Sequence, residues 1–200
     1  MKIEPSKKSP KSQLRKEIRR KRAGVDNAQR KHWDALINQH LDEYSSRAKP
    51  RIVAAYLAFD GEPDLMPSLA GMEKRGVKLA LPVVQDAPGK AIITLRHWSV
   101  GGELLKSRYG ILEPVGTGEI RVTDIDLVLV PLVAWDKTGG RLGMGASFYD
   151  RLFQPFSELA RPFRMGVGYG LQNVECIPLE PWDIRLHGIL TENDWFTCKH

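Results

Sequence analysis

The sequence predicts an α/β fold: a single three-layer α/β/α domain with a mixed, mostly parallel central sheet and an N-terminal helical arm. The 200 residues match the length of one ordinary domain, with residues 1–9 as a disordered basic lead-in and residues 10–200 as the domain. Apolar, β-branched stretches alternate with segments of helical periodicity. The most apolar stretch, residues 127–133, has the continuous hydrophobicity of a strand that is buried on both faces of a parallel sheet.

Two helices are expected before the first strand. Pro10 is favoured in the first turn of a helix, residues 11–22 are rich in helix formers, and Gly24 ends the segment. Asp26 is a suitable N-cap for a second helix over residues 26–47, whose apolar side chains recur every three or four positions. This spacing gives the second helix one apolar face with which to cover a sheet.

Strands and short helices then alternate along the chain. β-branched and aromatic residues predict a buried strand over residues 51–59, and a short helix over 65–75 leads to a parallel strand over 77–84. An antiparallel or edge strand is expected over 91–98, followed by a glycine-rich, irregular segment over 99–124. Further short strands are expected at residues 165–170 and 188–190.

Positive charge is concentrated near the N-terminus. The net charge is +6, but residues 1–31 hold 12 of the 30 Lys and Arg and only 3 of the 24 Asp and Glu, so the remaining residues have a net charge of −3. A basic arm of this kind is commonly a solvated helix face, and its functional interpretation is the capture of phosphates. A nucleic-acid-binding module would use the same arm, but such modules more often carry a basic surface throughout.

Several classes of protein are excluded by composition. Cys176 and Cys198 are the only cysteines and lack CxxC spacing, so neither a disulfide framework nor a zinc ribbon is expected. No apolar run approaches the ~20 residues of a membrane helix, and no apolar stretch follows the charged N-terminus as it does in a secretory signal. We therefore expect a cytoplasmic protein whose partners include neither a membrane nor a nucleic acid.

A glycine-rich loop over residues 139–147 follows the most apolar strand and leads into a helix that starts near Ser147. Ligands of α/β sheets bind beyond the carboxyl ends of strands. Small residues let the backbone approach a ligand, a helix start offers N–H groups to an anion, and Arg141 matches the geometry of phosphate. The loop has neither the ending of a Walker loop nor the spacing of the dinucleotide fingerprint. A glycine-rich turn with an exposed arginine explains these residues about equally well.

Five further residues are candidates for binding. Asp150 lies in the first turn of the helix after the loop, where it either holds Mg²⁺ beside phosphates or stabilises the helix dipole. Asp183 is a second isolated acid, and a turn cap is its simpler interpretation. Lys11 and Arg15 are one helical turn apart and would share an anion, although a solvated basic face explains each of them singly. Glu62 follows the first strand, where it either accepts paired N–H donors from a heterocycle or lies in a surface turn.

Motifs that carry a family resemblance run in order through nearly the whole chain. They are K-x-x-x-R at Lys11 and Arg15, a strand and turn ending in Glu62, L-P at residues 81–82, I-x-E-P at residues 111–114, and PLVAWDKTGGRLGMGASFYDR at residues 131–151. The last of these is a specific signature, because R-L-G-x-G-x-x-F/Y-Y-D-R follows a hydrophobic strand. With these motifs the chain resembles the 5-formyltetrahydrofolate cyclo-ligase family, also called 5,10-methenyltetrahydrofolate synthetases.

The resemblance implies an ATP-dependent carbon–nitrogen ligase of one-carbon metabolism. In this family ATP phosphorylates the formyl oxygen of 5-formyltetrahydrofolate, the folate nitrogen at position 10 attacks the activated carbon, and loss of phosphate gives 5,10-methenyltetrahydrofolate beside ADP. Such a transfer needs charge neutralisation and positioning more than a protein nucleophile. The corresponding expectations are ATP as co-substrate, Mg²⁺ as cofactor, a folate with or without a polyglutamate tail as partner, and a monomer.

The resemblance also implies roles for individual residues. Lys11, Arg15 and Arg141 are the expected catalytic residues. The expected ATP-binding residues are Lys11, Arg15, Arg141, Leu142, Gly143, Met144, Gly145, Ala146, Ser147, Phe148 and Tyr149. The expected folate-binding residues are Leu57, Glu62, Tyr109, Met144, Gly145, Ala146, Ser147 and Phe148. The expected magnesium ligands are Asp150 and Asp183.

The chain departs from the family at Ala146 and Ser147, where glycines are usual. A side chain costs ~1 kcal/mol or more if either position requires a positive φ. Alternatively, Ser147 caps the following helix and offers its hydroxyl to phosphate. Two competing hypotheses therefore stand beside an active ligase: a family member that binds folate or nucleotide without turnover, and a nucleic-acid-binding module that uses the basic arm.

Overall fold

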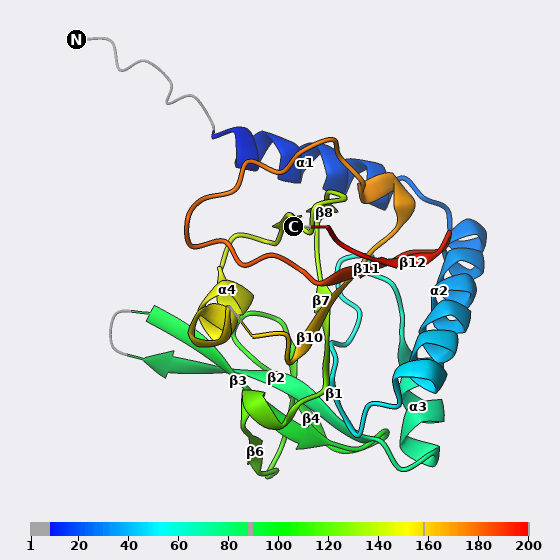
Figure 1. The fold of residues 1–200 in the computed structure, drawn as a ribbon, viewed down its shortest axis with the longest axis vertical. Helices are drawn as coiled ribbons and strands as arrows, with labels where there is room; N and C mark the ends of the chain where they lie inside the picture. Colours follow the sequence, from blue (N-terminus) through cyan, green and yellow to red (C-terminus); the bar gives the residue numbers. More distant parts are fainter. Residues whose placement is uncertain (1–8, 88–89, 158, 200) are drawn as a thin grey trace.

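The fold is built on an eight-stranded sheet (Figure 1) with the strand order β12-β11-β10-β7-β1-β2-β3-β6. The computed structural model describes residues 9–87, 90–157 and 159–199. The five strands from β11 to β2 run parallel to one another, whereas β12 at one edge and β3 and β6 at the other pair antiparallel. The predicted mixed, mostly parallel sheet is confirmed. The lead-in predicted for residues 1–9 lies outside the described residues except for Ser9.

The elements have the following bounds. The strands of the main sheet are β1 (Ile52–Ala54), β2 (Lys78–Ala87), β3 (Lys90–Trp98), β6 (Glu119–Ile120), β7 (Leu127–Pro131), β10 (Phe163–Val167), β11 (Gly188–Leu190) and β12 (Trp195–Thr197). Two small antiparallel sheets pair β4 (Leu104–Lys106) with β5 (Leu112–Pro114), and β8 (Ala134–Trp135) with β9 (Arg141–Leu142). The helices are α1 (Pro10–Ala23), α2 (Asn27–Ala48), α3 (Met66–Lys74) and α4 (Phe148–Phe153), with 3-10 turns η1 (Val122–Asp124), η2 (Gln154–Phe156) and η3 (Gly170–Gln172).

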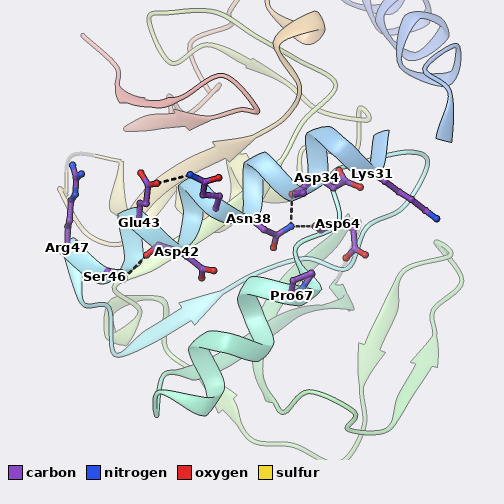
Figure 2. Close-up of a pocket in the computed structure, with 11 residues that line it drawn as sticks. Lys31, Asp34, Asn38, Asp42, Glu43, Ser46, Arg47, Asp64 and Pro67 are labelled. Atoms are coloured by element: carbon purple, nitrogen blue, oxygen red, sulfur yellow. Dashed lines mark hydrogen bonds between the residues drawn. The ribbon is translucent and has the colours of Figure 1, made fainter. Parts of the chain in front are cut away.

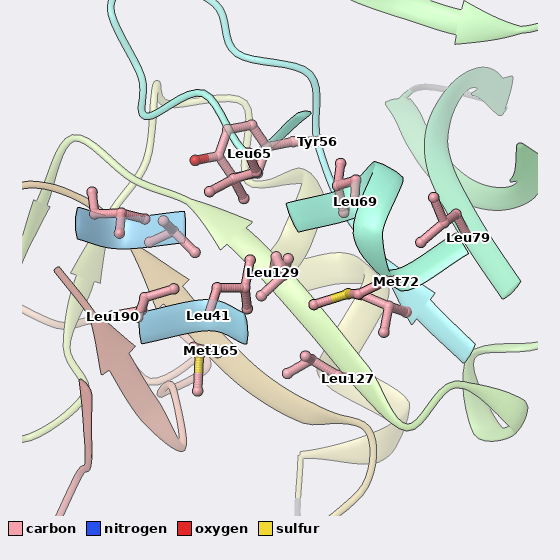
Figure 3. Packing of buried hydrophobic residues seen from close by; sticks show 14 of the residues in the cluster. Leu41, Tyr56, Leu65, Leu69, Met72, Leu79, Leu127, Leu129, Met165 and Leu190 are labelled. Atoms are coloured by element: carbon pink, nitrogen blue, oxygen red, sulfur yellow. The ribbon is translucent and has the colours of Figure 1, made fainter. Parts of the chain in front are cut away.

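Alternate residues of the strands point to opposite faces of the sheet, and each face has its own core. On one face Leu129 and Met165 pack against Leu41 of α2 and against α3, as Figure 3 shows. Val53 belongs to the same core. On the other face the alternate residues of β1 and β7 pack with Phe153 of α4. Because both faces are covered, β7 is buried along almost its whole length, as its continuous apolar sequence predicts.

The first two helices begin where their capping residues predict. The N–H of Ser12 donates to Oγ of Ser9 at the start of α1, and the N–H of Gln29 donates to Oδ1 of Asp26 at the start of α2. α1 lies across one end of the sheet (Figure 1), where Ile18 is buried against the β8–β9 hairpin. The helix of the predicted N-terminal arm is therefore packed onto the body of the protein.

The first strand is shorter than predicted, since β1 ends at Ala54 and residues 55–59 continue outside the strand. The apolar side chains of this segment pack in the core or line a cavity, and the segment is not part of a β-strand. Tyr56 is buried, and its hydroxyl donates to the carbonyl of Pro63 at 3.0 Å. A turn then reverses the chain, with positive φ at Asp60 and Gly61 (52° and 78°).

Three other features differ from the sequence prediction: the bounds of one strand, the structure of residues 99–124, and an additional edge strand. β10 begins and ends earlier than the predicted strand over residues 165–170, because its register is set by pairing with β7. The segment over residues 99–124 is not wholly irregular, since it contains β4, β5, β6 and η1. The edge strand β12 has no counterpart in the prediction, and its three residues are too few to carry a pattern.

Candidate functional site

A cavity of about 710 Å³ opens beyond the carboxyl ends of the neighbouring parallel strands β1 and β7. Its walls come from the segment after β1, the end of β7, the glycine-rich loop, the β4–β5 hairpin, α1, and residues near 180–183. Every predicted site residue lines this cavity: Lys11, Arg15, Leu57, Glu62, Tyr109, Arg141, Leu142, Gly143, Met144, Gly145, Ala146, Ser147, Phe148, Tyr149, Asp150 and Asp183. The fold thus brings together residues that are widely separated in sequence.

A buried carboxylate shapes the start of the glycine-rich loop. Oδ1 of Asp136 accepts the N–H groups of Thr138 and Gly140 and the Thr138 hydroxyl, while Oδ2 accepts the N–H of Ile177. Burial alone would raise the pKa of Asp136, but these hydrogen bonds hold it below its usual value. A Cβ at Gly140 would lie 2.3 Å from Oδ2 of Asp136, so glycine is required there. The loop is therefore held by a charged residue outside the ligand cavity.

The following part of the loop lines the cavity, and its backbone donors have no partner among the described residues. The N–H groups of residues 143–150 donate no hydrogen bond to any residue that the structure describes. Most backbone N–H groups in folded proteins are paired, with solvent or protein, so a consecutive run of them in a cavity wall is a ready binding surface for an anion. The helix that follows, α4, is only six residues long. The predicted contribution of its dipole is correspondingly small, and the loop amides are the main donors.

Arg141 and Asp150 form a close pair on the cavity wall. Nη2 of Arg141 lies 2.5 Å from Oδ1 of Asp150, and its Nη1 donates to the carbonyl of Ile184. The N–H of Ile184 also donates to Oδ1 of Asp150 at 3.1 Å. Arg141 is buried rather than exposed, which removes the interpretation of the loop as a turn with a solvated arginine. Oδ2 of Asp150 accepts nothing from the described part of the chain.

α1 contributes two cations to the cavity wall. Nζ of Lys11 lies 2.5 Å from Oδ2 of Asp183, which also accepts the N–H of Glu180. Nε of Arg15 donates to the carbonyl of Gly143 at 2.7 Å, so the helix is tied to the loop. Both side chains are partly buried, and neither belongs to a freely solvated face. Oδ1 of Asp183 has no hydrogen-bond donor among the described residues.

Glu62 occupies the side of the cavity nearest β1. Its Oε2 accepts the N–H of Phe59 at 3.2 Å within the turn. Burial raises the pKa of Glu62 to about 7, against the opposing effects of the Arg22 charge and of the Phe59 hydrogen bond. Burial, together with the Glu62 charge, also raises the pKa of the nearby Tyr149 hydroxyl. Glu62 is thus a carboxylate whose charge is poorly solvated and available to a partner.

Ser147 has a left-handed backbone, with φ 50°, whereas Ala146 is not among the residues with positive φ. The side chain of Ser147 makes no capping hydrogen bond to α4. The alternative in which Ser147 caps the helix is therefore wrong. The backbone places the cost of a missing glycine at Ser147 alone, because only that position of the two adopts a conformation that disfavours side chains.

Aromatic and apolar residues form the rim. Tyr109, from the turn between β4 and β5, meets Phe148 edge to face with ring centroids 5.5 Å apart. Sequence reasoning missed thirteen lining residues, among them Tyr56, Lys106 and Trp182. Tyr56 and Trp182 adjoin predicted residues, which is the only signal that could have found them. Lys106 carries no local signal, because its place depends on how the hairpin folds over the sheet.

A second hollow, of about 930 Å³, lies on the surface between α2 and α3 (Figure 2). Asp34, Asp42, Glu43 and Asp64 line it, with Lys31 and Arg47 at its ends. It contains none of the predicted site residues. Within residues 9–87, 90–157 and 159–199, no cluster of three or more His, Cys, Asp or Glu is arranged to hold a metal ion, and no helix has the length and apolarity to cross a membrane.

The fold and cavity define an α/β protein with a candidate ligand site at the carboxyl edge of its sheet. The sequence model of the 5-formyltetrahydrofolate cyclo-ligase family matches residues 7–192. The chain is 31% identical over 180 residues to the 5-formyltetrahydrofolate cyclo-ligase of Haemophilus influenzae, covering 89% of this chain and 95% of the relative. The same identity over 180 residues relates it to the Escherichia coli K12 enzyme, with 87% and 96% covered. The chain belongs to the 5-formyltetrahydrofolate cyclo-ligase family.

Solved structures agree with this assignment. The NMR structure of Aquifex aeolicus 5,10-methenyltetrahydrofolate synthetase superposes with a TM-score of 0.81 at 30% identity, covering 96% of this chain and 94% of that one. A 5,10-methenyltetrahydrofolate synthetase from Mycoplasma pneumoniae shares the fold, with a TM-score of 0.75 at 22% identity over 92% and 99% of the two chains. The resemblance inferred from the motifs is confirmed at the level of family and fold.

Proposed function

We propose that this chain is an ATP- and Mg²⁺-dependent ligase that converts 5-formyltetrahydrofolate to 5,10-methenyltetrahydrofolate with release of ADP and phosphate. The observation that carries the proposal is a run of N–H groups over residues 143–150 that pair with no described residue, in a cavity that Lys11, Arg15 and Arg141 also line. The names of the relatives, 5-formyltetrahydrofolate cyclo-ligase and 5,10-methenyltetrahydrofolate synthetase, support the substrate and product.

The proposed chemistry balances without a protein nucleophile. The formyl oxygen attacks the terminal phosphorus of ATP, and the bond from that phosphorus to ADP breaks. The folate nitrogen at position 10 then attacks the activated formyl carbon and loses its proton to water, and phosphate departs with the former formyl oxygen. The task of the protein is to align the two substrates and to neutralise the phosphate charge, which is the main source of catalysis in phosphoryl transfer.

The cations and the loop divide this task. Lys11 and Arg15 approach from α1 and Arg141 from the start of the loop, so positive charge faces the bound phosphates from two sides. Arg15 already donates to the Gly143 carbonyl, which places its guanidinium beside the loop amides. In a site with little water these groups stabilise charge more strongly than they would in solution.

The acidic residues fit a magnesium ion. Asp150 and Asp183 both line the cavity, and each retains one carboxylate oxygen that accepts no hydrogen bond from the described residues. Mg²⁺ is typically held by one or two carboxylates together with substrate phosphates, so the small donor set is sufficient. When bound, Mg²⁺ would supply neutralisation of phosphate charge. Asp150 and Asp183 are the residues that would hold it.

The folate side of the cavity is apolar with one acceptor. Leu57, Tyr109 and Phe148 offer surface against which a flat ring packs, and Glu62 offers a carboxylate to ring N–H donors. Met144 and the neighbouring loop residues 145–147 also line the cavity, where the two substrates would meet. A small folate, bound by a monomer in the cytoplasm, is the partner this proposal requires.

The first experiment mixes the purified chain with 5-formyltetrahydrofolate, ATP and Mg²⁺ and follows the near-ultraviolet absorbance of the methenyl product. A rise that requires both ATP and Mg²⁺ is expected. No rise with intact folate binding would favour a family member without turnover. Binding of nucleic acid that falls steeply with salt and requires residues 1–31 would favour the remaining hypothesis, against which the net charge of the other residues argues.

A further inference from the structure

Arg22, near the end of α1, is a buried arginine that no part of the proposed reaction uses. Its side chain is 1% exposed. Nη1 donates to the carbonyl of Leu132, directly after β7, and Nη2 donates to Oδ2 of Asp60 at 2.8 Å. Leu132 lines the cavity, and Asp60 lies two residues before Glu62. One guanidinium therefore joins α1, the end of the central strand and the turn that carries Glu62.

The turn itself is held by Asp60 rather than by the sheet. Arg19 forms a two-bond fork to Asp60, with Nε–Oδ2 at 2.9 Å and Nη2–Oδ1 at 3.1 Å. These bonds from Arg19, with the added charge of Arg22, hold the pKa of Asp60 below its usual value, so the carboxylate stays ionised. The N–H of Glu62 donates to the Phe59 carbonyl at 3.0 Å, which closes the turn. The position of Glu62 thus depends on a carboxylate that two arginines of α1 fix.

A third arginine closes the turn from the side of α2. Nη2 of Arg30 donates to the carbonyl of Arg22 at 3.2 Å. A Cβ at Gly61 would lie 2.5 Å from Nη1 of Arg30, so the backbone of the turn is in close contact with this guanidinium. The turn has little room to shift, and its placement is determined by the ends of α1 and the start of α2.

We propose that Arg22 is a positioning residue for folate binding: through Asp60 it fixes the turn that carries Glu62, and its buried charge keeps the Glu62 carboxylate ready to accept ring N–H donors. The proposal rests on the proposed function. It assigns to α1 a second role besides phosphate binding, because the same helix presents Arg15 and Lys11 to the cavity about two and three turns earlier. The same helix, α1, would then position residues on both the nucleotide side and the folate side of the cavity.

Two charges near Glu62 affect its pKa in opposite directions, and this allows the proposal to be tested. The groups that act on Glu62 are Arg22 of α1 and Asp60 of its own turn, while Tyr56 after β1 and Tyr149 of α4 are neutral neighbours that feel its charge. Arg22 favours the ionised form and Asp60 opposes it. Removing the first charge and removing the second therefore move the titration of Glu62 in opposite directions, which loss of folding stability would not do.

The test is calorimetric titration of the full chain with 5-formyltetrahydrofolate, and separately with ATP and Mg²⁺, between pH 5.5 and 8.5. The variants are Arg22→Met, Arg22→Lys and Asp60→Asn. Asn tolerates the positive φ of position 60, so this last variant removes the charge while keeping the turn. Asp124→Asn is the matched control, because Asp124 accepts a two-bond fork from Arg121 at 2.9 and 3.0 Å on the exposed η1, outside the cavity.

We expect wild-type folate affinity to fall below a midpoint near pH 7, where Glu62 becomes protonated. Arg22→Met should raise that midpoint and Asp60→Asn should lower it, each by about half a pH unit. Both should weaken folate binding at pH 8 by roughly tenfold while changing ATP binding much less. Arg22→Lys should keep the wild-type midpoint, and Asp124→Asn should match wild type throughout.

The results that would contradict the role of Arg22 differ from those that would contradict the proposed function. If Arg22→Met does not fold, the opposite shift in Asp60→Asn decides the question alone. Midpoints that stay fixed or move in the same direction, or ATP affinity that falls as far as folate affinity, would overturn the positioning role even though the wild type turns over. A wild-type chain that does not bind 5-formyltetrahydrofolate at all would contradict the proposed function, and the role of Arg22 with it.

Discussion

Nζ of Lys11 lies 2.5 Å from Oδ2 of Asp183, which joins the first turn of α1 to a segment 172 residues later. Arg141 and Asp150 are paired in the same way in the cavity wall, also at 2.5 Å, and both bond to Ile184, the residue after Asp183. Two of the three proposed phosphate-binding cations, Lys11 and Arg141, are therefore each paired with a proposed magnesium ligand, whereas Arg15 donates to the Gly143 carbonyl. Binding of magnesium with ATP would exchange these partners, the metal taking the carboxylates and the phosphates taking the cations.

This exchange predicts that Asp183→Asn separates nucleotide binding from its metal dependence. Without the Asp183 charge, Lys11 is free to meet phosphates, so ATP in the presence of a chelator should bind roughly three- to tenfold more tightly than to wild type. The gain in affinity on adding Mg²⁺ should shrink. Calorimetric titration with and without EDTA measures both quantities. Unchanged or weaker chelator-state binding would contradict the exchange of partners.

Arg15→Ala should raise the KM for ATP more than the KM for 5-formyltetrahydrofolate. The side chain lies beside the loop amides through its bond to Gly143, so its loss removes a charge from the phosphate side, at a cost of about 1.5–3 kcal/mol in ATP interaction. Steady-state kinetics with each substrate varied in turn gives the two values. Arg20→Ala, an exposed cation of the same helix, is the matched control and should resemble wild type. Equal effects of Arg15→Ala on both substrates would indicate a structural helix only.

Ser147→Gly and Ala146→Gly should have opposite effects on stability. Ser147 has φ 50°, so glycine there relieves roughly 1 kcal/mol of backbone strain. Ala146 is not among the positive-φ residues, so glycine there adds only unfolded-state entropy and should destabilise by about 0.5–1 kcal/mol. Urea unfolding of the two single variants distinguishes them. Because Ser147 already adopts the positive φ in the wild type, turnover by Ser147→Gly should rise little, and a sharp rise would instead support the hypothesis of an impaired family member.

The sequence predicts those elements whose structure is determined by residues close together in the chain. Pro10 and Asp26 mark the starts of α1 and α2 because capping acts within one turn, and β7 is recognisable because burial on both faces leaves no polar position. The strand predicted up to Phe59 is too long. Tyr56 is buried in the hydrophobic core, but it does not belong to a β-strand. Local pattern does not distinguish these two cases.

In the candidate site, too, local motifs predict some features, whereas others depend on the three-dimensional fold. Motifs place the glycine-rich loop and Glu62 in the right part of the fold, since the carboxyl ends of β1 and β7 meet at one edge. Arg22 could not be separated from the other cations of α1, because its burial depends on where Leu132 and Asp60 arrive in three dimensions. Likewise, that Ser147 rather than Ala146 carries the strain is a property of the folded loop.

Glu62→Gln should stabilise the protein at alkaline pH while abolishing folate binding. Burial raises the pKa of Glu62 to about 7 in the folded chain, above its usual value of 4.5. The folded state therefore prefers the protonated form, and the stability associated with that preference is fully present below pH 4.5 and lost as the pH rises through 7. A neutral glutamine does not incur this loss. Its advantage over wild type should be on the order of 2 kcal/mol at pH 8.5 and much smaller at pH 5.

Urea unfolding of wild type and Glu62→Gln at these two pH values, beside folate titration, measures the trade between stability and binding. Glu175→Gln, at an exposed glutamate outside the cavity, is the control for charge removal and should show no such pH-dependent advantage. An equal stability difference for Glu62→Gln at both pH values would mean that the Glu62 carboxylate is better solvated than its burial implies. Folate affinity that survives the substitution would remove the carboxylate from the binding site, because the amide cannot accept two ring N–H donors with charge.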